Sequence, residues 1–138
     1  MTRNHAYESA GNWCIVGMLE YLLSKENLAD YFLKNFSFYF LPMTNPDGVY
    51  NGLSRLTSAK GADLNRLHTV PDKAWDTIKK TLDKVKPHIF INIHNWMNKF
   101  KDGLLCLDKD FAKKIIFYMP DQKEYGKKWY VEDWDEYY

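Results

Sequence analysis

The first long apolar pattern of the chain has the spacing of a helix. Mostly apolar residues recur at i, i+3, i+4, i+7, i+8, i+11 and i+12, namely Ala10, Trp13, Cys14, Gly17, Met18, Tyr21 and Leu22. Further apolar side chains fill other faces of the same segment, so the pattern predicts a mostly buried helix from about Ser9 to Ser24. Leu28, Tyr31 and Phe32 predict a second, short helix that ends near Asn35.

The rest of the chain alternates between short apolar runs and amphipathic segments. Strands are predicted for the aromatic run 36–41, which Pro42 ends, for the apolar run 89–93, and for 104–107. Helices are predicted for about 73–84 and for 109–118, with Asp108 as a plausible N-cap of the latter. The long polar connection 43–72 between these elements is typical of a functional or a disordered loop.

Composition is typical of a globular protein and bears mainly on its partners and its redox compartment. The 138 residues are enough for one domain, and 46% hydrophobic with 27% charged residues is ordinary for a globular protein. A net charge of +1 gives no electrostatic case for nucleic acid or a membrane surface as a partner. The two cysteines, Cys14 and Cys106, favour a reducing compartment over a disulfide framework, and Cys14 is predicted to be buried within its apolar helix.

Candidate chemistry lies at two points that are far apart in the sequence. His5 and Glu8 stand three residues apart near the start, and His94 ends the apolar run 89–93. Two histidines and one carboxylate, with an open fourth position, are the ligands of a hydrolytic zinc site. Each residue taken alone has a plainer interpretation, because His5 could be a surface histidine and His94 a strand-end histidine bonded to backbone.

Four motifs in a fixed order are more specific than any one of them. HxxE at His5–Glu8, NPDG at 45–48, DLNR at 63–66 and the late His94 together resemble the zinc carboxypeptidases, with the cytosolic and bacterial-type branch closest. The resemblance runs from Thr2 to about Leu107. It implies an α/β fold with a mixed sheet flanked by helices, of the phosphorylase/hydrolase-like type. We therefore expect residues 1–138 to form one partial catalytic domain, incomplete at both ends.

The resemblance also implies a role for each matching residue. His5, Glu8 and His94 would hold one Zn²⁺ per chain, and Asp63 would accept a hydrogen bond from a ligand histidine. Asn65 and Arg66 match the pair that captures the carboxylate at the C-terminus of a substrate. Arg55 matches the arginine that stabilises the oxyanion. The general-base glutamate of the family has no match, since Glu124, Glu132 and Glu136 lie in the tail without its strand context.

The implied function is that of a zinc metallocarboxypeptidase, which hydrolyses the C-terminal peptide bond of a peptide or protein. Its expected location is the cytoplasm. Two alternatives stay open from the sequence. One is an amidohydrolase on N-acyl amino acids, similar to aspartoacylase or succinylglutamate desuccinylase, and the other is a zinc-binding or peptide-binding protein without catalysis. The side-chain preference and the oligomeric state are not indicated.

Overall fold

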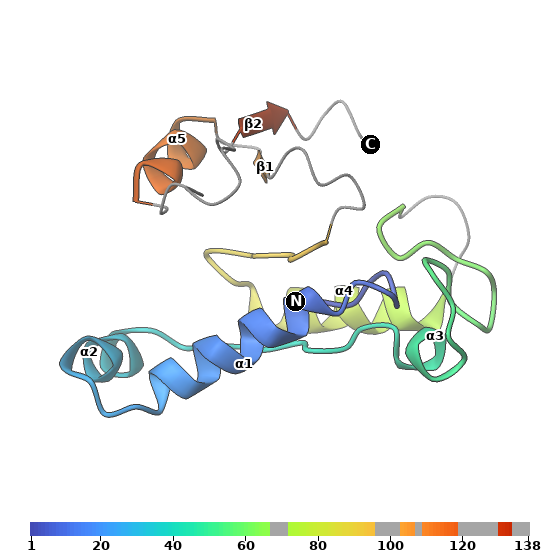
Figure 1. Ribbon diagram of the computed structural model, residues 1–138, viewed down its shortest axis with the longest axis horizontal. Coiled ribbons are helices and arrows are strands. Elements are labelled where there is room, and N and C mark those ends of the chain that lie inside the picture. Colours follow the sequence, from blue (N-terminus) through green and yellow to red (C-terminus); the bar gives the residue numbers. More distant parts are fainter. Residues whose placement is uncertain (67–71, 96–102, 107–108, 119–129, 134–138) are drawn as a thin grey trace. The chain divides into compact units, whose positions relative to one another are not determined.

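The computed structural model describes residues 1–66, 72–95, 103–106, 109–118 and 130–133 (Figure 1). The chain divides into two compact units, 1–95 and 96–138, and each is considered by itself. Five helices and two strands are present in the described part of the chain. The candidate residues near the start and His94 all belong to the first unit, so its architecture is what positions the site.

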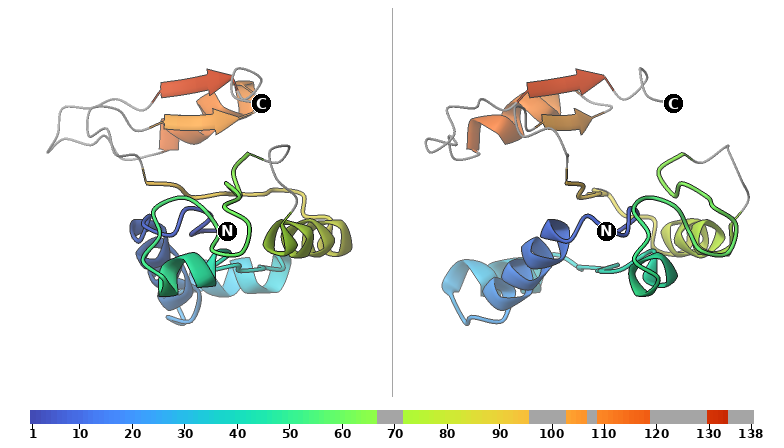
Figure 2. Two further views of the ribbon diagram at one scale, coloured as in Figure 1. Left: turned by 90° about the vertical axis from the view of Figure 1, so that its right-hand side faces the viewer. Right: turned by 45° about the vertical axis from the view of Figure 1, so that its right-hand side comes forward.

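Four helices make up the first unit, and Figure 2 shows them joined by extended connections. Their bounds are Ala10–Leu22 for α1, Asn27–Asn35 for α2, Pro46–Tyr50 for α3 and Lys73–Val85 for α4. The start of α4 follows from its sequence, because the side chain of Asp72 accepts a hydrogen bond from the Ala74 N–H. Its end follows as well, since Lys86 takes a left-handed conformation with φ of 47°.

Three extended segments lie side by side where the site begins. Thr2 donates its N–H to the Leu41 carbonyl at 3.0 Å, and on the other side Ile93 donates to the Met1 carbonyl at 2.9 Å. Thr2 and Ile93 form an isolated parallel bridge. Close packing supports this contact, because a Cβ on Gly11 would lie 2.9 Å from a methyl group of Thr2. The chain leaving Thr2 and the chain leaving Ile93 therefore run together into the region of His5, Glu8 and His94.

The predicted mixed sheet flanked by helices is wrong for the residues that the structure describes. Residues 36–41 are extended but belong to no strand, and 89–93 contribute only the single bridge at Ile93. A strand needs a neighbour along its length to satisfy its backbone groups, and these runs have the side-chain pattern of strands without that neighbour. The sheet that is present has two strands and lies in the second unit.

The second unit contains a short parallel pair of strands with a helix between them in sequence. β1 spans Gly103–Cys106, α5 spans Lys109–Tyr118 and β2 spans Tyr130–Asp133, with Gly103 opposite Tyr130. The helix predicted for 109–118 is confirmed, and the strand predicted for 104–107 lies one residue earlier. The predicted cap Asp108 falls outside the described residues.

Helix α1 is far more exposed than its apolar pattern predicts. Only Gly11, Ile15 and Leu22 of this helix are buried, whereas the side chain of Trp13 is 73% exposed. Cys14 is a free cysteine and is exposed, which contradicts the prediction of a buried thiol. The predicted burial is wrong because apolar residues occupy every face of α1, while the described part of the unit covers one face only. Among the described residues, no helix has the length and apolar character needed to span a membrane.

Candidate metal centre

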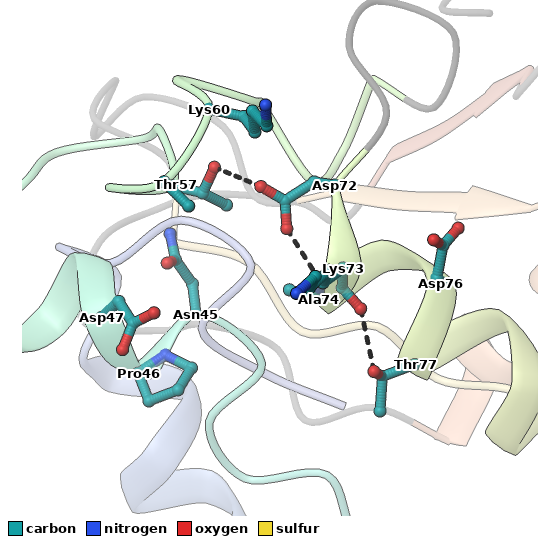
Figure 3. A pocket seen from close by; sticks show the side chains of 11 residues that line it. Asn45, Pro46, Asp47, Thr57, Lys60, Asp72, Lys73, Ala74, Asp76 and Thr77 are labelled. Atoms are coloured by element: carbon teal, nitrogen blue, oxygen red, sulfur yellow. Dashed lines mark hydrogen bonds between the residues drawn. The ribbon is translucent and has the colours of Figure 1, made fainter.

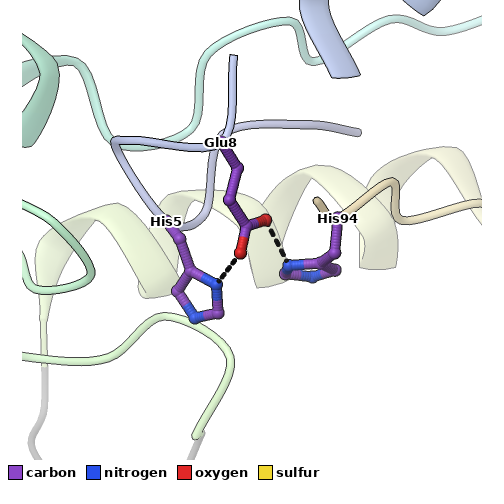
Figure 4. A group of neighbouring side chains, drawn as sticks. All are labelled: His5, Glu8 and His94. Carbon is purple, nitrogen blue, oxygen red and sulfur yellow. Dashed lines mark hydrogen bonds and ion pairs between the residues drawn. The ribbon is translucent and has the colours of Figure 1, made fainter. Parts of the chain in front are cut away.

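His5, Glu8 and His94 meet in a compact cluster (Figure 4). One ligand atom of each lies within 4.8 Å of the other two. The Nδ1 atom of His5 is 2.7 Å from one oxygen of Glu8, and the Nδ1 atom of His94 is 2.8 Å from the other oxygen. His5 and Glu8 are buried, and His94 is half-buried. The structure thus brings together three donors that lie near the two ends of the sequence of the first unit.

Glu8 is held as a carboxylate at the centre of this cluster. Burial by itself would raise its pKa, but hydrogen bonds from His5 and His94, the charge of His94 and the Asn95 N–H outweigh burial and lower the pKa to about 2. The Asn95 N–H lies 3.1 Å from the same Glu8 oxygen that contacts His94. The backbone just after His94 therefore helps to fix the orientation of the carboxylate.

Asp63 lies behind His5, on the side away from Glu8. Its carboxylate oxygen is 3.0 Å from Nε2 of His5 and also accepts the N–H of Asn65 at 2.8 Å. Burial lowers the pKa of His5, but its hydrogen bonds and charge interactions with Glu8 and Asp63 raise it overall. A histidine between two carboxylates donates a proton to each, or donates to Asp63 and offers the Nδ1 lone pair to a cation.

The donor set of the cluster fits zinc. Two imidazole nitrogens and a carboxylate are ligands that zinc takes in hydrolytic centres, and such centres keep one position open. The arrangement around His5 has the outer carboxylate that usually accompanies a zinc-bound histidine. Nε2 of His94 is buried and has no hydrogen-bond partner among the described residues. His5, Glu8 and His94 are therefore the residues that would hold the ion, with Asp63 orienting one of them.

The NPDG motif supports the loop that carries His5. Asn45 is the N-cap of α3, where its side-chain oxygen accepts the Gly48 N–H at 3.0 Å. The amide of Asn45 also donates to the Asn4 carbonyl at 3.3 Å. Thr44 donates to the side chain of Asn4 at 2.6 Å. These two supporting residues were missed, although an Asn before Pro at a helix start is a visible capping signal.

The predicted substrate-binding residues adjoin this cluster through Asp63. Asn65 and Arg66 are half-buried, and Arg66 donates from Nη1 to the Asn65 carbonyl at 2.9 Å. The Asn92 amide lies 3.5 Å from the side-chain oxygen of Asn65, at the limit of a hydrogen bond. Arg55 is half-buried and makes no hydrogen bond or ion pair with any residue in the described part of the chain. The roles of these residues stay predictions.

The general base stays unassigned. Glu124 and Glu136 lie outside the described residues, and Glu132 lies in β2 of the second unit.

A separate open pocket lies between α3, the loop 57–60 and the start of α4 (Figure 3). None of the candidate ligands lines it, and neither do Asn65 and Arg66. Its wall is held by Asp72, which accepts from the Thr57 hydroxyl at 2.7 Å and caps α4. The polar groups of Asp72 and Thr57 are thus engaged in hydrogen bonds that hold the fold.

Two histidines and a glutamate, with a carboxylate behind one histidine, are the donor set that one class of zinc hydrolases uses. The sequence model of one family in that class, described as zinc carboxypeptidase, matches residues 1–123. The chain belongs to the zinc carboxypeptidase family, and the resemblance seen in its motifs is confirmed.

Curated relatives match shorter parts of the chain. Cytosolic carboxypeptidase 4 of Mus musculus is 47% identical over 64 residues, which is 46% of this chain and 6% of that protein. Cytosolic carboxypeptidase 2 of Homo sapiens is 35% identical over 105 residues, which is 70% of this chain and 12% of that protein. Cytosolic carboxypeptidase 6 of Caenorhabditis elegans is 41% identical over 69 residues, which is 50% of this chain and 15% of that protein. The chain therefore spans a small part of the length of these relatives. No solved structure matches it significantly.

Proposed function

We propose that the chain supplies the zinc-binding and substrate-carboxylate-binding part of a metallocarboxypeptidase, which hydrolyses the C-terminal peptide bond of a peptide or protein. The observation that carries this proposal is the cluster in which donors of His5, Glu8 and His94 lie within 4.8 Å of one another. Membership of the zinc carboxypeptidase family supports the reaction class. Similarity to cytosolic carboxypeptidases supports a carboxypeptidase over an amidohydrolase on N-acyl amino acids.

Each candidate residue would have a distinct role that follows from its chemistry. Zinc, when bound, would polarise the scissile carbonyl and lower the pKa of water for attack. Arg66 would grip the terminal carboxylate of the substrate with its planar guanidinium, and Asn65 would add a neutral donor. Arg55 would stabilise negative charge that develops on the carbonyl oxygen. Such a grip on the chain end is what restricts cleavage to the last peptide bond.

The cellular compartment proposed for this activity is the cytoplasm. The relatives are named cytosolic carboxypeptidases, and the free thiol of Cys14 agrees with a reducing environment. The substrate would be the C-terminus of a peptide or protein.

The first experiment is to measure the zinc content of the purified chain. We expect one zinc per chain in the wild type and none in His5→Ala, because losing a ligand from a three-ligand site removes most of its affinity. His88→Ala is the matched control, since His88 is an exposed histidine outside the cluster, and it should keep the zinc. Equal zinc content in wild type and His5→Ala would refute the site.

A second experiment separates substrate capture from metal binding. Zinc-loaded wild type and Arg66→Ala are titrated calorimetrically with a dipeptide, with the same dipeptide amidated at its C-terminus, and with N-acetylaspartate. Arg66→Ala should weaken dipeptide binding about tenfold to hundredfold, as expected for a lost hydrogen bond to a charged group, and leave zinc content unchanged. A loss of zinc in parallel with dipeptide binding would show that Arg66 has a structural role. A preference for N-acetylaspartate would favour the amidohydrolase alternative.

A further inference from the structure

Asn92 lies in the extended segment that carries His94 to the metal cluster. Ile93, which stands between them, forms the bridge to Thr2. Side chains at i and i+2 of extended backbone lie on the same face, so Asn92 and His94 share the face opposite Ile93. The side chain of Asn92 is half-buried, and its amide contacts the side chain of Asn65. Asn92 therefore adjoins the proposed substrate-binding residues, two positions before a metal ligand.

The backbone of Asn65 is held on both sides of its side chain. Its N–H donates to Oδ1 of Asp63 at 2.8 Å, and its carbonyl accepts from Nη1 of Arg66 at 2.9 Å. The same oxygen of Asp63 contacts His5. These bonds leave the orientation of the side-chain amide open, because an asparagine can turn either its oxygen or its NH2 group toward a ligand. A neighbour of the amide must decide between the two.

Asn92 makes the contact that distinguishes the two ends of the Asn65 amide. Nδ2 of Asn92 is 3.5 Å from Oδ1 of Asn65, and Nδ2 of Asn65 donates to no group in the described part of the chain. With its oxygen turned toward a donor, the planar amide directs its NH2 group away from Asn92. That end can donate to a carboxylate, whereas the oxygen end would repel it. The contact is at the limit of a hydrogen bond, and such contacts are often long until a ligand binds.

The other end of the Asn92 amide indicates that this residue does more than stabilise the fold. Oδ1 of Asn92 is buried, and it has no hydrogen-bond partner among the residues that the structure describes. Buried polar atoms are normally paired, and an unpaired one costs stability. An apolar residue of the same size would avoid this cost. The asparagine is therefore better explained by the donor that it offers to Asn65.

We propose that Asn92 is a positioning residue, which holds the NH2 group of Asn65 toward the terminal carboxylate of the substrate. This role rests on the proposed function, because Asn65 is the neutral donor proposed for that carboxylate. Asn92 acts through Asn65 and does not contact the substrate. The segment that ends in His94 thus serves two parts of the site, since it supplies a metal ligand and also orients a substrate-binding side chain.

Two variants of Asn92 remove the contact in different ways. Asn92→Leu replaces both polar ends of the amide at similar size, and Asn92→Ser is too short to reach Asn65. Each should weaken binding of a dipeptide with a free C-terminal carboxylate by about threefold to tenfold, because Asn65 then presents its NH2 group only part of the time. Affinity for the same dipeptide amidated at its C-terminus should change by less than about twofold, since a neutral acceptor gains less from the donor. Asn27→Leu, at an exposed asparagine of α2, is the matched control and should bind like wild type.

A double-mutant cycle with Asn65→Ala separates positioning from direct contact with the substrate. In the Asn65→Ala background, Asn92→Leu should leave dipeptide affinity unchanged, because the amide that Asn92 orients is gone. Isothermal titration calorimetry of the zinc-loaded proteins measures the affinities, and zinc content and circular dichroism are recorded for every variant. Both should match wild type, because the side-chain hydrogen bond of Asn92 to the described residues goes to Asn65 and not to a candidate metal ligand.

Wild-type affinity for the free dipeptide in both Asn92 variants would overturn the positioning role. So would an equal loss with and without the Asn65 side chain, an equal loss for free and amidated dipeptides, or a loss of zinc or folded structure in both variants. If Arg66→Ala weakens dipeptide binding and the Asn92 variants do not, only the role of Asn92 fails. A wild type that binds the two dipeptides equally would refute capture of a substrate carboxylate, and the proposed function with it.

Discussion

The loop of residues 2–8 and helix α1 are neighbours in sequence, but both differ from the usual pattern of apolar residues inside and polar residues outside. The loop buries polar side chains, and the helix exposes apolar ones. In the loop, the polar residues Asn4, His5 and Glu8 are 2%, 5% and 4% exposed. In α1, the apolar residues Trp13 and Tyr21 are 73% and 41% exposed. The polar loop is stable in its buried position because its groups bond to Thr44, Asn45 and Asp63, so that little polarity is left unpaired. The helix exposes apolar surface because the described part of its unit offers too few partners.

This difference between the loop and α1 indicates where mutations should change stability or metal binding most. Contacts in the loop are specific, so the loss of one partner leaves a buried polar group or charge unsatisfied. Contacts on the outer faces of α1 are few, so a change there alters little in the isolated chain.

Removing His94 should have the greatest effect on the loop. His94→Ala deletes a metal ligand and a hydrogen bond to Glu8, so we expect zinc content to fall from one per chain to none. Elemental analysis of the purified variant measures this directly, with His88→Ala as control. Zinc that remains at wild-type stoichiometry would exclude His94 as a ligand.

A change at Asp63, the partner of His5, should reduce metal affinity less than the loss of His94. Asp63→Asn keeps the size of the side chain but removes the charge that orients the Nε2–H of His5. Losses of about 10-fold to 100-fold in metal affinity are typical for such outer partners. Competition with a zinc chelator would measure the change, and Asp47→Asn, at an exposed aspartate outside the cluster, is the control. An unchanged affinity would show that Asp63 does not orient the ligand.

A methyl group inside the NPDG cap should loosen the support of the loop. A Cβ at Gly48 would lie 2.6 Å from side-chain atoms of Asn45, so Gly48→Ala should destabilise the unit by about 1–3 kcal/mol. Gly17→Ala in α1 is the matched control, because a Cβ there meets nothing within 4 Å and alanine should stabilise the helix by about 0.5–1 kcal/mol. Denaturant unfolding monitored by circular dichroism measures both. Equal effects of the two substitutions would contradict the importance of the cap.

The metal-free loop should be most stable over a window of mildly acidic pH. The pKa of Glu8 is lowered from 4.5 to about 2, so its contribution is complete above 4.5 and is lost as pH falls through about 2. The pKa of His5 is raised above 6.5, so its contribution is complete below 6.5 and is lost as pH rises through the folded value. Unfolding in the presence of chelator should therefore show maximal stability between pH 4.5 and 6.5.

Glu8→Gln is the variant that tests the origin of this window, because it removes the charge shared by both histidine contacts. Its stability should depend less on pH than that of the wild type. A wild-type profile that stays flat from pH 4.5 to pH 8 would contradict a charged contact between His5 and Glu8 in the metal-free protein.

The smallest effect is expected on the exposed face of α1. Trp13→Gln removes an apolar side chain that is 73% exposed, and surface changes of this kind usually stay within about 0.5 kcal/mol. Unfolding of the isolated chain measures it. A loss of several kcal/mol would mean that Trp13 is covered in solution, and the contrast between loop and helix would not hold.

The sequence predicted local elements better than their arrangement. Helix 73–84 was predicted and α4 spans Lys73–Val85, because apolar residues at helical spacing and the cap Asp72 are local signals. The strand 36–41 was predicted from its aromatic residues, but strand formation needs a neighbour that no local pattern specifies. The same reasoning explains why α1 was predicted to be buried, since burial depends on what covers each face.

For the site, the motifs identified which residues come together but not what supports them. His5, Glu8 and His94 meet as the order of motifs suggested, although zinc binding itself stays a prediction. The bonds from Thr44 and Asn45 to Asn4 were not anticipated, because a buried amide contact between residues 40 positions apart leaves no periodic trace in a sequence. The capping signal at Asn45 was visible, but its second role was not.

The contact between Glu8 and His94 joins residues 86 positions apart and so has a kinetic meaning. Contacts of such high contact order form slowly, because the entropy of closing the intervening chain must be lost before the contact can stabilise anything. Nearly the whole first unit must therefore be in place before the three donors converge. The rate at which a folding chain becomes able to take up a metal ion should then report the completion of folding in this unit, and not an early local step.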